Sequence, residues 1–248
     1  MDGNQHYMLR IMQLLRVLLK FYLFAIVSTP VPTRLEFSVM IDAITYETAH
    51  LLGDILPGIF RLRYQLFVER EGYNVPNHAG MEWDQFDTPV AVYLVWRDAT
   101  AQPRAVARLI PTTFPYMLRE LWPDLVTKQE LSSRPDCWEL TRFGVARSLP
   151  ARERRQVVGE LVCGVMEFGL MHGITSFLHL AHPAVIESVL TDPGCTVTLL
   201  GERRRLGRFP VVPASLEVNE ETLVRVRQYH GLKHPVLRLV REAAALAA

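Results

Sequence analysis

The sequence predicts an α/β (α+β) domain: a mixed β-sheet flanked by helices and arranged as a three-layer sandwich. Three observations favour this class. A helix-patterned region opens the domain, two apolar segments joined by a short turn follow as a hairpin, and strand and helix patterns then alternate toward the end of the chain. Antiparallel pairing early in a chain and crossover helices later give a mixed sheet with helices on both faces.

The first half of the domain contains a helical region, a long loop and the hairpin. Residues 47–71 are patterned as a helix, with a break or restart predicted at Pro57-Gly58. Residues 72–89 are rich in Gly, Asn, Pro and Asp and form a predicted loop. Loops of that length inside a compact domain are often functional. The hairpin is predicted from two β-type segments, 91–97 and 104–110, which flank a turn.

The second half of the domain alternates between strands and helices. A helix over 152–172 is predicted because Val157, Leu161 and Val165 recur at helical spacing. The other expected elements are strands over 138–146, 174–180, 196–200 and 211–218 and helices over 184–190 and 220–229. This layout suits the acyltransferase folds of the GNAT type, although many α+β folds share it.

Residues 1–39 differ from the rest and are interpreted as an N-terminal extension to a domain spanning residues 40–248. The uninterrupted apolar run 21–27 is much shorter than the roughly 20 residues that span a bilayer, so no stable membrane span is predicted. Three interpretations remain open. They are a mis-assigned start with Met40 as the true first residue, an amphipathic or membrane-touching helix, and a cleaved signal peptide.

The composition excludes some classes of function. The chain of 248 residues has a formal net charge of +1, so bulk electrostatics gives no reason to expect a nucleic-acid partner. The three cysteines are widely spaced and lack a CxxC pair. This argues against a disulfide framework or a zinc site and fits a cytoplasmic location. His179 and His182 have HxxH spacing without the third ligand and the glutamate of zinc motifs, so no metal site is predicted.

A segment of the long loop, GMEWDQFDT, gathers three carboxylates. Glu82, Asp84 and Asp87 lie within six residues, and carboxylates packed this closely repel unless a cation binds among them. The cation can be a metal, an ammonium or a sulfonium, although the regularly spaced oxygen ligands of a metal site are not apparent. The interleaved Trp83 and Phe86 suggest that the loop folds against the core. The alternative is an acidic surface loop.

Two predicted strands carry charges among apolar residues. Arg108 lies inside the segment RLIPT, where an unpaired charge is costly, so we expect it to meet one of the loop carboxylates. Glu139 and Arg142 interrupt the segment WELTRF, and strand periodicity places them on opposite faces unless a bulge intervenes. The apolar neighbours of Glu139 favour a raised pKa, which a general base working near neutral pH needs. The alternative is a structural Glu–Arg pair.

Arg63 and Phe67 lie four residues apart on the predicted helix and therefore share one face. An arginine there can clamp a carboxylate, and the ring can stack on a flat ligand. The alternative is a surface arginine beside a core phenylalanine.

These segments together resemble one family. The order Arg-x-x-x-Phe, GMExDxxD, RLxPT and WELxRF resembles the acyl-homoserine-lactone synthases (autoinducer synthases) from about Met40 to the C-terminus. Each motif is weak by itself, and the combination is specific. Two positions depart from the family pattern: Tyr73 stands where the family usually has Trp, and Trp122 where it usually has Phe. The matching positions are Arg63, Phe67, Glu82, Asp84, Asp87, Arg108, Glu139 and Arg142.

The resemblance implies a GNAT-like acyltransferase that makes a quorum-sensing signal. Such an enzyme transfers an acyl group from acyl carrier protein or coenzyme A (CoA) to the amine of S-adenosylmethionine (SAM). The SAM carboxylate then displaces methylthioadenosine and closes the lactone. SAM is a substrate in this scheme, so no cofactor is expected. Glu139 is the candidate base, and Arg142 is the second catalytic candidate.

The expected binding residues form three groups. SAM is expected to contact Arg63, Phe67, Tyr73, Asp84, Asp87 and Arg108. The acyl pocket is expected at Trp122, Phe143, Phe177 and His179. The carrier protein or CoA is expected to contact Arg147, Arg152, Arg154 and Arg155, for which a solvated helix start is the alternative. By analogy with GNAT-type folds, backbone N–H groups in the strand after Glu139 would stabilise the oxyanion.

Two other functions remain open from the sequence. A GNAT-type N-acyltransferase acting on another amine would normally carry a glycine-rich Q/R-x-x-G-x-G/A loop, which the segment RSLPARERR after WELTRFGVA lacks. A catalytically inactive SAM- or acyl-binding sensor is the other alternative, and the intact Glu139 and Asp84 argue against it.

Overall fold

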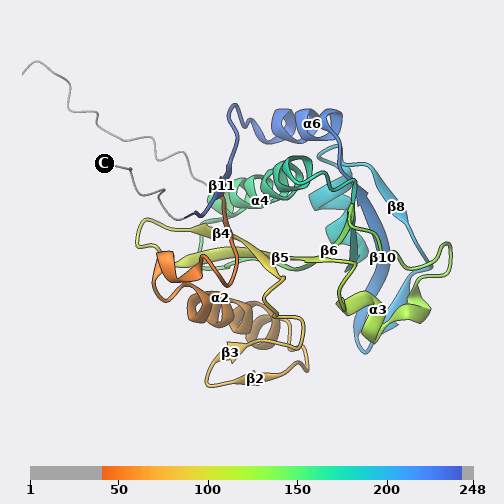
Figure 1. Cartoon of the computed structure of the whole chain (residues 1–248), viewed down its shortest axis with the longest axis horizontal. Helices are drawn as coiled ribbons and strands as arrows, with labels where there is room; N and C mark the ends of the chain where they lie inside the picture. Colours follow the sequence, from red (N-terminus) through yellow and green to blue (C-terminus); the bar gives the residue numbers. More distant parts are fainter. Residues whose placement is uncertain (1–40, 242–248) are drawn as a thin grey trace, which may run out of the picture. The chain divides into compact units, whose positions relative to one another are not determined.

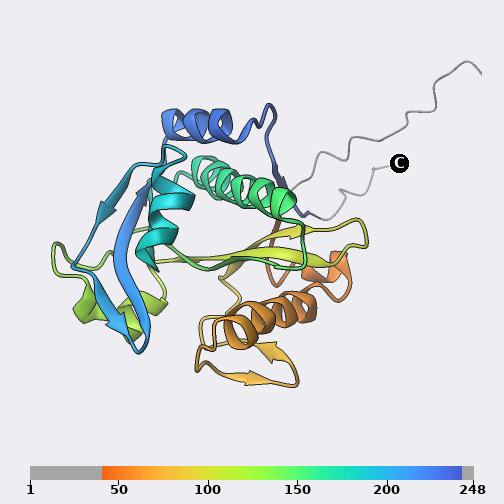
Figure 2. The same ribbon diagram turned by 180° about the vertical axis from the view of Figure 1, so that it is seen from behind.

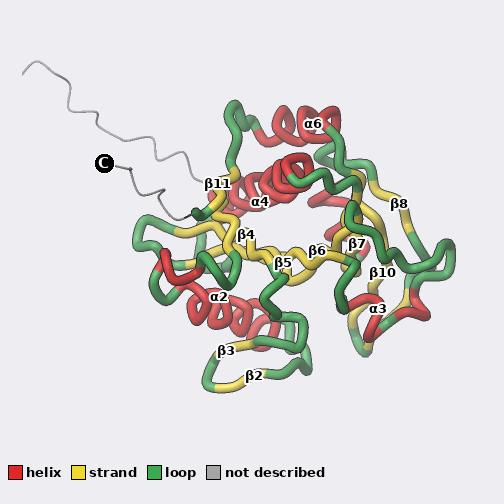
Figure 3. The backbone as a smooth tube through the Cα atoms, viewed as in Figure 1, coloured by secondary structure: helices red, strands yellow, loops and turns green. Residues whose placement is uncertain are grey.

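The computed structural model describes residues 41–241, so the three interpretations of residues 1–39 lie outside the described residues. Within this part of the chain, one sheet has the strand order β11-β1-β4-β5-β6-β7-β10-β8, and β9 pairs with β10 (Figure 3). The pairs β1–β11 and β6–β7 are parallel, and the other pairs are antiparallel. The mixed sheet that the sequence predicts is therefore confirmed.

The strands of this sheet are β1 (Ile41–Ile44), β4 (Val92–Arg97), β5 (Pro103–Pro111), β6 (Cys137–Val145), β7 (Ser176–Ala181), β8 (Val197–Leu199), β9 (Arg204–Leu206), β10 (Phe209–Glu217) and β11 (Leu237–Leu239). A separate small hairpin consists of β2 (Asn77–His78) and β3 (Met81–Glu82). The α-helices are α2 (Ile55–Arg63), α3 (Met117–Leu121), α4 (Ala151–Met171), α5 (Pro183–Val185) and α6 (Glu220–His230). Two segments are 3-10 helices, η1 (Ala49–Leu52) and η3 (Pro123–Leu125), and two are π-helices, η2 (Tyr64–Arg70) and η4 (Ile186–Thr191).

The helices cover both faces of the sheet. Figures 1 and 2 show α2 on one side of β4, β5 and β6 and α4 on the other, with α6 on the outer side of α4. Each face has its own apolar core. The α4-side core contains residues such as Leu94, Leu109 and Leu161, and the α2-side core contains Ile59 and Val106. Because side chains alternate along a strand, β4 and β5 supply both cores, which explains their nearly continuous apolar sequence.

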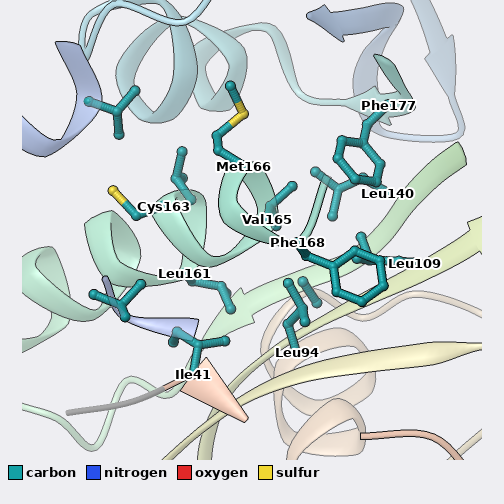
Figure 4. Close-up of a cluster of buried hydrophobic side chains, with 14 of the residues drawn as sticks. Ile41, Leu94, Leu109, Leu140, Leu161, Cys163, Val165, Met166, Phe168 and Phe177 are labelled. Carbon is teal, nitrogen blue, oxygen red and sulfur yellow. The ribbon is translucent and has the colours of Figure 1, made fainter. Parts of the chain in front are cut away.

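Helix α4 forms the centre of the larger core. Its apolar residues recur every three or four positions, as the sequence predicts, and Leu161, Val165 and Phe168 are buried. Figure 4 shows these side chains among Leu94 and Leu109 from the sheet. On the other side of α4, Gly159 lies so close to the His230 ring that an added Cβ would collide with it. Close packing of α6 on α4 therefore depends on this glycine.

The predicted break at Pro57-Gly58 is wrong. The helical region is interrupted earlier, at Gly53, which has a positive φ of 63° between η1 and α2. Pro57 lies in the first turn of α2, where a backbone N–H would have no partner within the helix, so a proline is tolerated there. Helix α2 then continues into η2, a π-helical turn. The sequence pattern also misses β1 and β11, since both strands are very short.

An irregularity in β6 shapes the region that carries the candidate site. The β5–β6 register shifts between Val106 and Arg108, and Arg142 has a positive φ of 52°. On its other side, β6 pairs with β7 only over Cys137–Glu139. From Thr141 onward β6 is therefore paired on one side only, and its remaining backbone groups face the gap toward β7.

Between residues 41 and 241, no helix is both long and apolar enough to cross a membrane.

Candidate active site

The loop before β4 folds into a compact turn that presents its three carboxylates to the α2 side of the sheet. The Asp84 side chain accepts a hydrogen bond from the Phe86 N–H at 2.9 Å, and the Asp87 side chain accepts one from the Asp84 N–H at 2.7 Å. Phe86 is buried, as the sequence suggests, whereas Trp83 is 40% exposed. The turn is thus fixed against the core by one of its two aromatic rings.

Three arginines from three elements meet these carboxylates. Arg63 of α2 donates from Nε to Glu82 at 2.6 Å and from both terminal nitrogens to Asp87 at 2.6 and 3.0 Å. Arg108 of β5 donates to both oxygens of Asp84, at 2.6 and 3.1 Å, and to Asp87 at 2.8 Å. The expectation that Arg108 meets a loop carboxylate is therefore confirmed. We call Arg63, Arg108, Arg142, Glu82, Asp84 and Asp87 the ionic cluster.

Arg142 joins the ionic cluster because of the bulge in β6. It donates to Glu82 at 2.8 Å and to Asp84 at 2.7 Å. Regular alternation would place Arg142 on the face opposite Glu139, and the sequence allowed for a bulge that changes this. The register shift beside Arg142 and its positive φ are that bulge. Positive φ is strained for a non-glycine residue, and here the ion pairs with the two carboxylates of Glu82 and Asp84 offset that strain.

The ionic cluster is electrically balanced and almost completely buried. The Arg63 and Arg108 side chains are fully buried, and Arg142 is the most exposed member at 10%. The three positive guanidinium groups match the three negative carboxylates. The sequence considered a metal, an ammonium or a sulfonium as the cation of the acidic loop, and an acidic surface loop as the alternative. In the structure, guanidinium groups fill that role.

The charges in the ionic cluster reinforce one another. Burial alone would raise the pKa of Asp87, but Arg108 and Arg63 outweigh it and hold that pKa well below its ordinary range. Burial would likewise lower the pKa of Arg63, but hydrogen bonds to Glu82 and Asp87 raise it. Asp87 and Arg63 therefore stay ionised at neutral pH and are not a source of protons.

Sequence reasoning missed two hydroxyl groups in the site. The Tyr93 hydroxyl of β4 donates to Asp87 at 2.7 Å, and burial followed by the Asp87 charge raises the Tyr93 pKa. The Thr141 hydroxyl of β6 accepts a hydrogen bond from Arg108 Nε at 3.1 Å. The available signal was the position of Tyr93, since its hydroxyl is the one oxygen-bearing side chain in the apolar run VYLVW.

Glu139 lies on the α2-facing side of β6 but outside the ionic cluster. Its two carboxylate oxygens accept hydrogen bonds from the Met117 and Leu118 N–H groups at 2.9 and 2.6 Å, so it holds the start of α3. Burial raises the pKa of Glu139 to about 7, against the opposing effects of these two N–H groups and of Arg108. A carboxylate oxygen accepts more than one hydrogen bond, so Glu139 retains capacity to take a proton.

Two predicted aromatic residues lie beside the ionic cluster. Phe67 and Tyr73 have nearly parallel rings with centroids 6.1 Å apart and an interplanar angle of 8°. The Arg142 guanidinium lies 5.5 Å from the Phe67 centroid. The structure therefore brings Phe67, Tyr73 and Arg142 together, as expected for one binding site.

The four residues expected in an acyl pocket contact different cores. Trp122 packs on the α2-side core, while Phe143 and Phe177 pack on the α4-side core. Phe177 and His179 are two residues apart on β7, so their side chains lie on the same face of the sheet. Burial lowers the pKa of His179 to about 4, so its imidazole is neutral.

His182 caps α5 by accepting a hydrogen bond from the Ala184 N–H. No metal-binding group of three His, Cys, Asp or Glu residues occurs within residues 41–241.

The four arginines after β6 have two different roles. Arg154 donates to the carbonyl groups of Arg147 and Leu149, both at 3.1 Å, and so fixes the loop that leads into α4. Arg152 and Arg155 are exposed and line a shallow hollow beside Tyr229 and His230 of α6. Positive charge thus gathers at the N-terminus of α4, where backbone N–H groups already favour anions.

Comparison with known proteins decides the family. A model of the autoinducer synthase family matches residues 49–226. The chain belongs to the autoinducer synthase family. It is accordingly an enzyme of the acyltransferase class. An isovaleryl-homoserine lactone synthase from Bradyrhizobium diazoefficiens is 31% identical over 191 residues, covering 74% of this chain and 82% of that protein. An acyl-homoserine-lactone synthase from Aliivibrio fischeri is 28% identical over 168 residues, covering 66% of this chain and 86% of that protein.

Solved structures of autoinducer synthases share the fold. The CoA-dependent acyl-homoserine lactone synthase BjaI, in a structure with MTA, has a TM-score of 0.74 and 28% identity, with 81% of this chain and 93% of that chain covered. A second structure of BjaI, with SAM and isopentyl-CoA, has a TM-score of 0.73. The predicted family and fold class are therefore confirmed for this autoinducer synthase.

Proposed function

We propose that this autoinducer synthase transfers an acyl group from a thioester to the amine of SAM and then closes a homoserine lactone. The amine nitrogen forms the new amide bond as the C–S bond of the thioester breaks and releases the thiol. The SAM carboxylate then attacks its own γ-carbon, and methylthioadenosine leaves with the sulfur. The supporting observation is a buried carboxyl with a raised pKa, Glu139, on β6 where the pairing with β7 ends, in a member of this family.

Glu139 is proposed as the base that takes the proton from the SAM ammonium, directly or through a water. A base working near neutral pH is most effective when its own pKa lies near 7, and burial gives Glu139 a pKa of about 7. The N–H groups of Met117 and Leu118 fix the carboxyl in one orientation. This fixed orientation supports a catalytic role, because proton transfer needs a carboxyl held at a constant distance from the amine.

The outer edge of the ionic cluster is the proposed SAM site. Every nitrogen of Arg63 and Arg108 already donates to a carboxylate or hydroxyl oxygen, so these two arginines hold the acidic loop in place. Within residues 41–241, the one hydrogen bond found for Arg142 Nη1 goes to the Met117 thioether, at 3.6 Å. A thioether is a weak acceptor, so this nitrogen is available to bind the SAM carboxylate. Asp84 and Asp87 keep the site favourable for the cationic groups of SAM, and Phe67 and Tyr73 supply its aromatic wall.

The gap between β6 and β7 is the proposed place for the thioester. Backbone N–H groups of β6 after Glu139 that face this gap have no strand partner, so they can stabilise the oxyanion of the tetrahedral intermediate. The acyl chain is proposed to extend toward Trp122, Phe143, Phe177 and His179. Arg147, Arg152, Arg154 and Arg155 provide positive charge for a phosphopantetheine arm. Similarity to CoA-dependent synthases favours CoA over acyl carrier protein as the donor.

The test is a product assay with purified protein, SAM and a panel of acyl thioesters on both CoA and carrier protein. We expect release of thiol and methylthioadenosine together with a lactone whose mass identifies the acyl group. Absence of lactone across the whole panel would contradict the proposal. Thiol release that requires an amine other than SAM would replace it with a different N-acyltransferase activity.

A further inference from the structure

The hairpin formed by β9 and β10 reaches across to the aromatic wall of the proposed SAM site. Phe209, the first residue of β10, forms a T-shaped pair with the Tyr73 ring, with centroids 4.5 Å apart and an interplanar angle of 88°. Tyr73 in turn lies parallel to Phe67, and Arg142 lies over Phe67. A continuous row of Arg142, Phe67, Tyr73 and Phe209 thus runs from the ionic cluster to the hairpin.

A second contact fastens the same hairpin beside Tyr73. The Arg208 guanidinium donates a hydrogen bond to the Glu71 carbonyl and lies where a side chain on residue 72 would have to go. Gly72 also has a positive φ of 67°, so glycine suits both the turn and the contact. Arg208 additionally lies over the Phe209 ring, 4.9 Å from its centroid. The hairpin is therefore anchored on the three residues that end with Tyr73.

These neighbouring rings and the backbone determine the orientation of Tyr73. Its N–H donates to the Phe67 carbonyl at 2.8 Å, which fixes the backbone. No hydrogen bond to the Tyr73 hydroxyl is found in the described part of the chain, residues 41–241. The Tyr73 ring is instead held by a parallel contact with Phe67 and a T-shaped contact with Phe209. Edge-to-face pairs prefer this geometry because the positive edge of one ring meets the negative face of another.

We propose that Phe209 is a positioning residue for SAM binding, acting through Tyr73, and that the β9–β10 hairpin forms the outer wall of the SAM site. This inference rests on the proposed function. It assigns the hairpin, which follows the site motifs by more than sixty residues, to the binding of SAM and not to the acyl donor. Phe209 reaches the site through its ring contact with Tyr73, so it is a positioning residue and not a catalytic one.

The test compares Phe209→Leu with Arg204→Ala, an exposed control on β9 of the same hairpin. Leucine keeps the apolar volume and removes the ring. We expect the KM and the calorimetric Kd for SAM to rise roughly two- to ten-fold, the range that one aromatic pair contributes. The kcat at saturating SAM and the KM for the acyl thioester should stay at the values of Arg204→Ala. Phe209→Tyr, which restores the ring, should recover the wild-type KM for SAM.

Several outcomes would overturn this inference. One is an unchanged Kd for SAM in Phe209→Leu, and another is an equal loss in kcat, both KM values and thermal stability, which would indicate a merely structural ring. If Phe209→Leu does not fold, Arg208→Ala gives the second test, since it removes the anchor at Glu71 and should raise the KM for SAM alone. Wild-type protein that binds no SAM would overturn the proposed function as well, whereas wild-type binding with unchanged variants would overturn only the role of Phe209.

A double substitution checks that Phe209 acts through Tyr73. Tyr73→Leu removes the ring that Phe209 contacts, so adding Phe209→Leu to it should raise the KM for SAM no further. Independent, multiplicative effects of the two substitutions would contradict the proposed route.

Discussion

Two buried glutamates, Glu139 in β6 and Glu167 in α4, hold the chain in the same way and differ in one partner. Each accepts hydrogen bonds from two successive backbone N–H groups, Glu139 from Met117 and Leu118 and Glu167 from Val236 and Leu237. Glu167 also forms an ion pair with Arg227 at 2.7 Å. Within the described residues no arginine donates a hydrogen bond to Glu139.

The difference separates a structural carboxylate from a candidate catalytic one. With Arg227 beside it, Glu167 clamps the start of β11 and the end of α6 onto α4. Glu139 has no such counter-charge in contact, and its burial therefore raises its pKa to about 7. A buried carboxyl without an ion-pair partner costs stability and retains the ability to exchange a proton near neutral pH. The following predictions test this difference between Glu139 and Glu167.

The largest expected effect is on catalysis by Glu139→Gln. Glutamine keeps the size and can accept hydrogen bonds but cannot take a proton, so we expect kcat to fall by about 10²- to 10⁴-fold. SAM should still bind, as calorimetry would show. Glu167→Gln is the matched control, since it makes the same chemical change at a residue outside the site, and its kcat should remain near wild type. Unchanged turnover in Glu139→Gln would exclude Glu139 as the base.

The second prediction is that wild type and Glu139→Gln differ in how their free energy of unfolding depends on pH. The pKa of folded Glu139 is raised from 4.5 to about 7, so the folded state favours the protonated carboxyl. Its contribution to stability is therefore fully present below the unfolded pKa and is lost as pH rises toward about 7, a loss of up to about 3 kcal/mol. Urea unfolding from pH 4.5 to 8 should show this slope in wild type and a reduced slope in Glu139→Gln. An identical slope in both proteins would contradict the raised pKa.

The same titration governs the rate. A base must be deprotonated to act, and kcat/KM reports the pKa of the protein without substrate, so kcat/KM for SAM should rise with pH and level off above about 7. Rates of thiol release at low SAM across this range would measure it. A kcat/KM that is flat between pH 5.5 and 8 would not fit the assignment of Glu139.

A further prediction concerns the contribution of Glu167 to the stability of the protein. Glu167→Gln removes the negative charge that faces Arg227 and weakens two hydrogen bonds to backbone N–H groups. We expect the free energy of unfolding to fall by about 1–3 kcal/mol. The matched Glu139→Gln protein weakens the same kind of backbone hydrogen bonds but loses no ion pair and removes an unpaired buried carboxyl, so we expect a smaller loss of stability at pH 7. Equal destabilisation of the two variants would remove the distinction between them.

The smallest expected effect is that of Arg227→Gln. The Arg227 side chain is 26% exposed, so solvent already weakens its ion pair with Glu167. We expect a loss of about 1 kcal/mol in the free energy of unfolding, reduced further by added salt. A loss larger than that of Glu167→Gln would show that the arginine stabilises α6 by some other contact.

The sequence predicted the members of the site better than their arrangement. Arg108 was recognised because a charge among apolar neighbours needs a partner, and Asp84 and Asp87 because carboxylates crowded in one loop need a cation. Arg63 was recognised from the helix face that it shares with Phe67. Their pairing with one another into a neutral cluster was not predicted, because it depends on how a loop and three separate elements meet in space. The role of Arg142 depended on a bulge, which the strand pattern permitted but did not locate.

The predicted fold shows a similar division between long and short elements. Helix α4 and strands β4 and β5 have long, regular apolar patterns, and their positions were predicted closely. Strands β1 and β11 contain four and three residues, too few for a pattern to emerge. The break in the first helical region was misplaced because Pro57 looks like an interruption, although it lies where a helix accepts proline. Phe209 had no sequence signal, because its importance comes entirely from its contact with Tyr73.

The most direct test of the proposed function is the ratio of products formed from SAM and an acyl thioester by the purified wild-type protein. Chromatography with mass detection would quantify thiol, methylthioadenosine and acyl-homoserine lactone in one reaction. The proposed mechanism predicts equal amounts of the three, with no thiol formed when SAM is left out. Thiol released without methylthioadenosine, or SAM recovered unchanged while the thioester is consumed, would contradict it.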